Sequence, residues 1–383
     1  MGVRQDEHIR SPAGSPWPFS RPALMAGLRR YLDAPRLRLL EIEPMPLPHV
    51  LPGGAPDPLS DLHGMRVSVD IDGQVQQLAL VLKKAPVTAG GRVLSAVGRR
   101  EYGVYKRLAP HLPVLVPGLV AGDPVQGWIV VEALTGLRPP DAWTREDYIE
   151  AIVNLAAMHD RFWGLGQDLA IFAWLGRPLD ADYEATVMAA AEAVQSLVRE
   201  DRLPPLSTPR NFLAFGTLVQ HADEIVAPLR EETDTLLHGD YWPGNIACPI
   251  DGRQIVFDWQ RAGIGPAILD LVAFVKTTEM TLQPALPLDE GIALYRQEMA
   301  QRVEPAWDDE RFAMLWDHAL MWLFLTNWLG RLATMSLEDY EQLPPRFEHV
   351  WLRPFIEVLE RRLGITLPED AHDPKTPSGN RPL

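Results

Sequence analysis

The sequence predicts an α+β protein with two lobes, a small β-rich N-lobe followed by a larger, mostly helical C-lobe. Three observations lead to this prediction. Strand patterns with one helix among them precede Leu134, mainly helical patterns follow it, and residues 246–257 carry a hairpin pattern. A chain of 383 residues with 46% hydrophobic and 23% charged residues is long and apolar enough to fill two such lobes.

The N-lobe pattern begins at residue 66. Residues 66–72 alternate between apolar and polar, Gly73 follows as a turn, and residues 77–83 (QLALVLK) continue as a strand. A helix over 97–108 and strands over 118–121 and 127–132 complete the predicted lobe.

The two ends of the chain differ from the rest in composition. Residues 1–20 and 367–383 are polar and rich in Pro, Gly and Ser, which is typical of flexible tails. We therefore expect an N-lobe over 21–133 and a C-lobe over 134–366, with a flexible tail at each end.

Residues 238–258 (HGDYWPGNIACPIDGRQIVFD) hold most of the functional information in the chain. Asn245 follows Asp240 by five positions, and Asp258 stands at the end of an apolar run. This is the spacing of the kinase catalytic loop, His-x-Asp-x-x-x-x-Asn, followed by a metal-binding Asp. The alternative is structural: the His-Gly-Asp triplet is then a turn and Asp258 a helix cap.

The segment between these polar residues predicts a hairpin. Residues 246–248 form a short apolar strand, residues 249–252 a turn that ends in Gly, and residues 254–257 a return strand. We expect this hairpin to bring Asn245 and Asp258 side by side.

Phosphoryl transfer explains why these residue types are needed. A hydroxyl that attacks a γ-phosphate needs a carboxylate to orient it and accept its proton, and Asp240 is the candidate. The triphosphate needs divalent cations, and Mg²⁺ prefers hard oxygen ligands such as the amide of Asn245 and the carboxylate of Asp258.

The segment resembles the aminoglycoside phosphotransferase and choline kinase group, which are small-molecule kinases with a protein-kinase-like fold. Gly239 in the middle of the triplet and the sequence from Pro266 to Asp270-Leu271 are marks of this group. The resemblance covers about residues 60–340 and implies that Asp270 braces the catalytic loop. His238 is expected to brace the same loop through hydrogen bonds. Trp242, Gln260 and residues 155–163 are more similar to the ecdysteroid-kinase-like branch.

The predicted N-lobe supplies two further candidates. Lys83 ends a strand, as the lysine that binds the α- and β-phosphates does in kinases, and Glu101 on the following helix is expected to pair with it. Lys84 competes with Lys83, but neighbours in a strand face opposite ways, so only one of them faces the cleft. We favour Lys83 because it shares a face with Val81.

The resemblance also implies where a nucleotide base and its phosphates bind. The hinge near Glu132 and Leu134 would bind the adenine edge through its main chain. No Gly-x-Gly-x-x-Gly is present, and the turn before Arg66 offers only Ser60 and Gly64 as candidates to cover the phosphates.

Charge and cysteine content exclude several classes of function. The net charge of −15 argues against a nucleic-acid partner, which would require clustered Lys and Arg. A single cysteine, Cys248, excludes an internal disulfide and a cysteine-based zinc site. Residues 1–20 lack the apolar core of a signal peptide, and the apolar window 319–330 is too short to span a bilayer. We therefore expect a cytoplasmic protein.

These observations favour a kinase that uses ATP, or GTP, with Mg²⁺ to phosphorylate a hydroxyl group of a small molecule. The first alternative is a non-catalytic relative that binds a nucleotide or ligand, and the second is a protein kinase, against which Gly239 and the short run from Asp258 to Asp270 count. The acceptor is open between two classes. A cationic antibiotic would need acidic residues, for which Glu279, Asp308 and Asp309 are positional candidates. An apolar alcohol would need aromatic residues, and Trp322 and Trp328 are candidates if they are not core.

Overall fold

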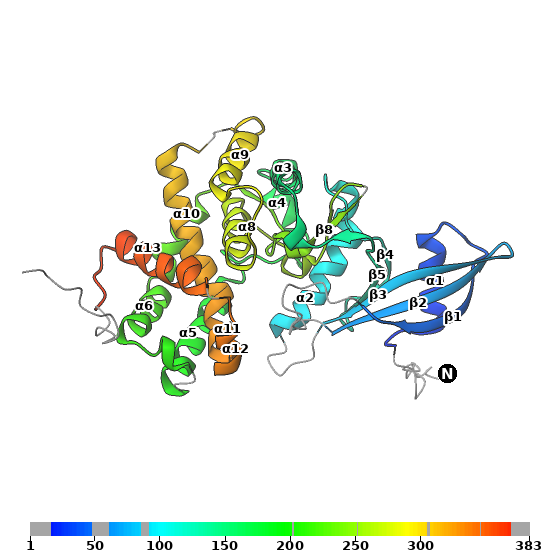
Figure 1. Ribbon diagram of the computed structural model, residues 1–383, viewed down its shortest axis with the longest axis horizontal. Helices are drawn as coiled ribbons and strands as arrows, with labels where there is room; N and C mark the ends of the chain where they lie inside the picture. Colours follow the sequence, from blue (N-terminus) through cyan, green and yellow to red (C-terminus); the bar gives the residue numbers. More distant parts are fainter. Residues whose placement is uncertain are drawn as a thin grey trace, which may run out of the picture. The chain divides into compact units, whose positions relative to one another are not determined.

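The computed structural model describes residues 17–47, 61–85, 92–200, 203–250, 252–304, 307–344 and 346–368 (Figure 1). The predicted α+β class is confirmed. The chain divides into two compact units, unit 1 with a five-stranded antiparallel sheet and unit 2, which is mainly helical. Unit 1 consists of Met1–Arg161, Phe172–Leu175 and Asp240–Ala262, and unit 2 of Phe162–Ile171, Gly176–Gly239 and Gly263–Leu383.

The sheet of unit 1 is antiparallel throughout, with the strand order β1-β2-β3-β5-β4. Its central hairpin pairs without interruption from Asp61 opposite Lys84 to Ile71 opposite Gln74. Asp72 and Gly73 form the turn, and both have positive φ angles, 50° and 87°, which match the twist of a two-residue hairpin. The strands are β1 (Arg38–Met45), β2 (Asp61–Ile71), β3 (Gln74–Lys84), β4 (Leu119–Asp123) and β5 (Trp128–Glu132).

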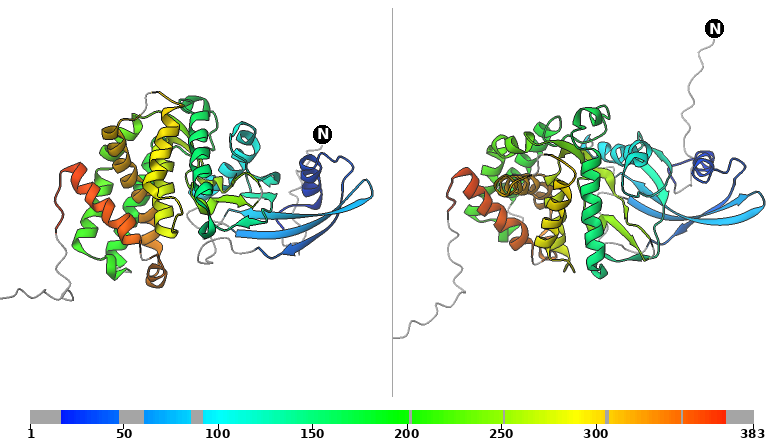
Figure 2. Two further views of the ribbon diagram at one scale, coloured as in Figure 1. Left: turned by 45° about the horizontal axis from the view of Figure 1, so that its top comes forward. Right: turned by 90° about the horizontal axis from the view of Figure 1, so that it is seen from above.

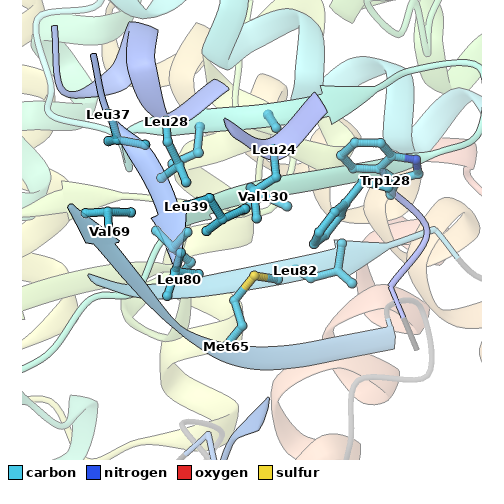
Figure 3. Packing of buried hydrophobic residues seen from close by; sticks show 14 residues of the cluster. Leu24, Leu28, Leu37, Leu39, Met65, Val69, Leu80, Leu82, Trp128 and Val130 are labelled. Atoms are coloured by element: carbon cyan, nitrogen blue, oxygen red, sulfur yellow. The ribbon is translucent and has the colours of Figure 1, made fainter. Parts of the chain in front are cut away.

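Helix α1 (Arg21–Tyr31) packs on one face of this sheet and completes a buried core (Figure 3). Leu24 and Leu28 of α1 meet alternate residues of the strands, among them Leu80 and Leu82 of β3. The period of two in a strand places Lys83 on the opposite face of the sheet. Neither α1 nor β1 was predicted from the sequence.

The helix after β3 changes its geometry part of the way along. Helix α2 (Arg92–Gly103) continues as a π-helical segment over Val104–Leu108. The predicted helix over 97–108 is therefore present and begins earlier. Within unit 1, α2 contacts a short 3₁₀ turn at Trp259–Arg261.

The predicted hairpin is present in unit 1 and pairs with a third strand. Strands β8 (Ile246–Pro249) and β9 (Ile255–Val256) are antiparallel, and β8 also pairs with β6 (Leu137–Arg138), which the sequence analysis missed. The amide of Phe257 donates to the carbonyl of Asn245 over 3.0 Å, so the pairing extends to the two ends of the hairpin.

Helix α3 (Arg145–Arg161) belongs to the same compact unit because polar side chains join it to the hairpin. Nε2 of Gln254 donates to the carbonyl of Asp147 over 2.7 Å, and the Cys248 thiol donates to Oδ1 of Asp147 over 3.1 Å. The predicted boundary at 133/134 instead assigned this helix and the hairpin to the C-lobe.

Unit 2 consists mainly of helices (Figure 2), and its described residues also contain a two-stranded antiparallel ladder of β7 (Asp234–Leu237) and β10 (Gly263–Pro266). Helix α10 packs against α7, α8 and α13. The helices are α4 (Gly166–Leu169), α5 (Tyr183–Glu200), α6 (Pro209–Gln220), α7 (Ala222–Arg230), α8 (Ile268–Thr281), α9 (Leu288–Ala300), α10 (Asp309–Phe324), α11 (Gly330–Thr334), α12 (Leu337–Glu341) and α13 (Arg353–Leu363).

Apolar residues near both ends of the described chain are buried, although the sequence analysis assigned them to tails. Phe19 packs on Trp128 in the core of unit 1, with the ring centroids 5.6 Å apart, and Leu367 is buried in unit 2. The polar composition of the flanking residues hid these apolar anchors. None of the helices in the described residues combines the length and apolar character that a bilayer span requires.

Candidate active site

The ammonium group of Lys83 lies between two carboxylates in unit 1. Nζ is 2.9 Å from Oε2 of Glu101 and 2.5 Å from Oδ1 of Asp258. The three side chains are largely buried, with exposed fractions of 12%, 6% and 17%. Lys84, the competing lysine, is on the opposite face of β3, and its Nζ lies 3.3 Å from Nε2 of His63. The predicted choice of Lys83 over Lys84 and its pairing with Glu101 therefore agree with the geometry.

Burial and charge act in opposite directions on this cluster. Burial alone would lower the pKa of Lys83, but the carboxylates of Asp258 and Glu101 outweigh it, and the pKa of Lys83 is raised. Burial raises the pKa of Glu101, while the attraction of Lys83 opposes this shift. The lysine is therefore held as a cation that can meet an anionic ligand.

Tyr105 is a member of this cluster that the sequence analysis missed. Its hydroxyl donates to Oε1 of Glu101 over 3.1 Å, so both carboxylate oxygens of Glu101 have a donor. The sequence signal that could have identified Tyr105 is its spacing of four residues from Glu101, which places the two side chains on the same face of a helix.

The main chain of Asp258 is in the left-handed region, with φ 64° and ψ 56°. This conformation is strained for a residue with a Cβ, and such strain is concentrated at functional sites. Trp259, which follows, is fully buried and donates from Nε1 to the carbonyl of Val256 over 3.1 Å. The return strand and this indole together fix where the Asp258 carboxylate points.

Asn245 orients the carboxylate of Asp240. Its Nδ2 donates to the carbonyl of Asp240 over 2.8 Å and to Oδ2 of the same residue over 3.0 Å. The amide nitrogen is thereby used inside the loop, which leaves Oδ1 of Asn245 as the acceptor of this side chain. An amide oxygen and the carboxylate of Asp258 are ligand types that fit Mg²⁺.

In unit 2, the carboxylate of Asp270 accepts two main-chain hydrogen bonds from the residues before Asp240. Oδ2 accepts from the amide of His238 over 2.7 Å, and Oδ1 from the amide of Gly239 over 2.8 Å. Gly239 has φ 80°, a conformation that favours glycine. The predicted bracing pair therefore meets through the main chain of His238, whose side chain is also buried.

Glu132 is the last residue of β5, and Leu134 lies two residues later in the chain. Both were predicted to bind a nucleotide base. The carboxylate of Glu132 is bound to protein groups: it accepts from the hydroxyl of Tyr31 over 2.5 Å and from the amide of Gly118 over 3.0 Å. The Glu132 side chain is therefore used inside unit 1, and base binding by the main chain of this segment stays a prediction.

The predicted phosphate-covering turn is different in the structure. Gly64 lies inside β2, opposite Val81 of β3 and Met45 of β1, and a Cβ there would lie 2.3 Å from the carbonyl oxygen of Met45. The glycine is needed for close strand packing and does not lie in the predicted turn, so its role toward the phosphates stays an untested prediction. Ser60 lies outside the described residues.

The candidate acceptor residues in unit 2 have structural partners. Glu279 pairs with Lys276 at 3.0 Å, Asp308 caps the start of α10, and Asp309 pairs with Arg296 at 2.8 Å. Trp322 and Trp328 are buried, with exposed fractions of 1% and 4%, which supports the core interpretation that the sequence favoured over a pocket wall.

Unit 2 also contains a cavity of about 320 Å³, lined by residues that include Trp163, Arg296 and Trp307. The indole of Trp307 donates to Glu232 over 2.8 Å. Glu232 precedes β7, whereas His238 follows the other end of that strand. The cavity therefore lies near the residues that precede β7.

Comparisons with known proteins bear on the identity of the chain. Among solved structures, it is similar to the choline kinase LicA from Streptococcus pneumoniae, at 12% identity over 85% of this chain and 94% of that one, with a TM-score of 0.47. It is also similar to an ethanolamine kinase from Plasmodium vivax, at 13% identity over 80% and 81%, with a TM-score of 0.47. A third similar structure is an aminoglycoside-3'-phosphotransferase of type VIII, at 22% identity over 77% of this chain and 99% of that one, with a TM-score of 0.43.

No curated protein matches the sequence. The model of the phosphotransferase enzyme family matches residues 66–306, which is more than half of the chain and includes the catalytic segment. The match confirms the resemblance and the predicted class of activity. The chain belongs to the phosphotransferase enzyme family.

Proposed function

We propose that this protein is a kinase that transfers the γ-phosphoryl group of ATP to a hydroxyl group of a small molecule. The observation that carries the proposal is the pairing of Lys83 with Glu101 and Asp258, in the same unit as an Asp240 carboxylate oriented by Asn245. In kinases, these residue types set the triphosphate and orient the attacking hydroxyl.

Asp240 would orient the acceptor and take its proton. Oδ2 of this carboxylate is held by Asn245, and the preceding amides of His238 and Gly239 are fixed by Asp270. A carboxylate held in one orientation positions a hydroxyl without the entropy cost of ordering the side chain during the reaction.

Mg²⁺ would be held by Asn245 and Asp258. The cation would neutralise charge that develops on the phosphate oxygens. Lys83 would move its ion pair from Asp258 to the α- and β-phosphates, while Glu101 keeps it aimed at them. Lys83 and Asp258 are 2.5 Å apart, so the phosphates that Lys83 would bind and the Mg²⁺ that Asp258 would bind would lie next to each other.

A turnover assay tests this function. The protein would be incubated with ATP or GTP, with and without Mg²⁺, against a panel of cationic amino alcohols, aminoglycosides and apolar alcohols. We expect Mg²⁺-dependent release of ADP with at least one acceptor and transfer of phosphate to it. The Asp240→Asn variant should lose at least about 100-fold in kcat and keep its affinity for the nucleotide, because Asp240 acts on the acceptor side.

The same assay separates the alternative, a non-catalytic relative that only binds a nucleotide. Such a protein would bind ATP with Mg²⁺ but turn over none of the acceptors. Full turnover by the Asp240→Asn variant would refute the proposed role of this residue.

A further inference from the structure

A tryptophan packs directly on the main chain of helix α2. Residues Phe172–Leu175 belong to unit 1, although they are far from α2 in the sequence. A Cβ at Gly103, the last residue of α2, would lie 2.5 Å from Cδ2 and Cε2 of Trp174. The indole therefore covers this glycine, and a larger side chain at position 103 would displace the ring or the helix.

The indole of Trp174 is itself held by its neighbours in the chain. The ring of Phe172 packs on it, with the ring centroids 5.3 Å apart, and Leu175, the next residue, is buried. Trp174 is half-buried between them. It therefore offers a fixed, rigid surface to the end of α2.

Gly103 and Glu101 lie on nearly opposite faces of α2. With 3.6 residues per turn, two positions along a helix correspond to a rotation of about 200°. Glu101 faces Lys83, whose Nζ is 2.9 Å from Oε2 of the carboxylate. Trp174 therefore contacts α2 on the side that is turned away from Lys83.

A second glycine brings α2 close to other main chain on the side that carries Glu101. Gly98 precedes Glu101 by three residues, so the two lie on the same face of the helix. A Cβ at Gly98 would lie 3.0 Å from Cα of Gly127, which directly precedes β5. Helix α2 is therefore held between the turn at Gly127 and the indole of Trp174.

The position of α2 determines the geometry of the ion pair with Lys83. Oε1 of Glu101 accepts from the hydroxyl of Tyr105, which lies in the π-helical segment directly after Gly103. Both donors to Glu101 are therefore set by where this part of the helix lies. A displacement of α2 by about 1 Å away from Lys83 would lengthen the 2.9 Å contact beyond the range of a hydrogen bond.

We propose that Trp174 is a positioning residue that supports α2 on the face opposite Glu101, so that Glu101 keeps Lys83 aimed at the phosphates of ATP. This inference rests on the proposed use of ATP. Without the indole, α2 can move into the vacated space and the ion pair lengthens. Lys83 then pairs with Asp258 alone, and its ammonium group is no longer aimed by the helix.

The test measures the dissociation constant of ATP with Mg²⁺, which requires no acceptor. We expect Trp174→Ala to raise this constant about 10-fold, the worth of one hydrogen bond to a charged group. Glu101→Ala should raise it by a similar factor. The double variant should bind ATP no more weakly than Glu101→Ala alone, because Trp174 acts through this carboxylate. Independent effects that multiply to about 100-fold would overturn the inference.

Two further variants change the same contact in other ways. Trp174→Phe keeps a ring over Gly103 and should bind ATP within about 2-fold of the wild type. Gly103→Ala adds the Cβ that would lie 2.5 Å from the indole, so it should weaken ATP binding although alanine is the better helix former. A loss in Trp174→Phe as large as in Trp174→Ala would contradict the proposal, and so would wild-type affinity in Gly103→Ala.

Trp17→Ala is the matched control. Trp17 is a half-buried tryptophan of the same unit, and its ring stacks on Phe19 with the centroids 6.1 Å apart. It packs against the core on the α1 face of the sheet, which is opposite to the face of Lys83. This variant should lower the melting temperature and leave the dissociation constant of ATP unchanged. An equal rise of that constant in Trp17→Ala and Trp174→Ala would indicate a general loss of stability and overturn the inference.

The outcomes separate this inference from the proposed function. Wild-type affinity for ATP in Trp174→Ala would overturn the inference alone, and turnover of an acceptor by the wild type would still support the kinase. An effect of Trp174→Ala that disappears in the Glu101→Ala background would support the inference even if no acceptor were turned over. A wild type that bound no ATP would overturn both proposals.

Discussion

The Nζ atom of Lys83 lies closer to Asp258 than to its helical partner Glu101, at 2.5 Å against 2.9 Å. One buried cation therefore holds two carboxylates that would otherwise repel each other. Strand β3, helix α2 and the turn after β9 meet at this ammonium group. Its removal should therefore change the free energy of unfolding and the way in which that free energy depends on pH.

Replacing Lys83 with Met should lower the free energy of unfolding at pH 8 by about 3 kcal/mol, because two carboxylates are left buried without a cation. The folded-state pKa of Glu101 is already raised by burial and would rise further without Lys83. A raised folded-state pKa gives stability at low pH that is lost as the pH rises through it. The loss should therefore shrink as the pH falls from 8 toward the ordinary pKa range of a glutamate carboxyl. Urea denaturation at several pH values measures this.

Lys84→Met is the matched control, because it removes the same charge from the next residue on the other face of β3. We expect a loss below about 1 kcal/mol that changes little with pH. Equal losses in the two variants would contradict the central role of the Lys83 ion pairs.

The left-handed conformation of Asp258 predicts a difference between two substitutions that both remove its charge. Asn tolerates this conformation, whereas Ala does not, so Asp258→Ala should be about 1 kcal/mol less stable than Asp258→Asn. Both should bind the nucleotide with Mg²⁺ more weakly than the wild type. Thermal unfolding and titration with ATP separate the two effects. Equal stabilities would indicate that the turn relaxes out of the left-handed region.

The burial of Trp322 and Trp328 predicts that truncating either indole costs stability rather than acceptor binding. Trp322 stacks on Tyr183, with the ring centroids 5.8 Å apart, and Trp328 packs on Phe347 at 4.5 Å. We expect each change to Ala to cost about 3–5 kcal/mol and to leave both KM values near normal in the folded protein. Trp316→Ala, at a half-buried position of α10, should cost less. A large rise of the acceptor KM alone would indicate that the helix forms a pocket wall.

The environment of Cys248 predicts an unreactive thiol. Burial and the hydrogen bond to Asp147 raise the pKa of Cys248 to about 12, so almost no thiolate exists at pH 8. In the native protein, a thiol reagent should therefore label Cys248 no faster than the protein unfolds locally around it. In denaturant, the same reagent should label Cys248 at once. Asp147→Asn keeps the thiol and removes the charged acceptor, so it should increase the rate of labelling. Rapid labelling of the native wild type would contradict the prediction.

Sequence patterns predicted those parts of the site that short-range structure determines. Asn245 and Asp258 are joined by a hairpin with its own turn signal, and the period of two in β3 distinguished Lys83 from Lys84. The Tyr31–Glu132 contact could not be predicted in this way, because it joins residues 101 positions apart through the packing of α1. Gly64 was misassigned because a glycine has the same appearance in a turn and in a close approach of two strands.

The register of β3 has a consequence for how the sequence of this protein can change over time. Lys83 and the core leucines at 80 and 82 occupy opposite faces of one strand, so inserting or deleting one residue between them would turn either the lysine or the leucines to the wrong side. Point substitutions leave the register of the strand unchanged. Active descendants of this chain should therefore keep the length of this strand and gain or lose residues at the Asp72–Gly73 turn.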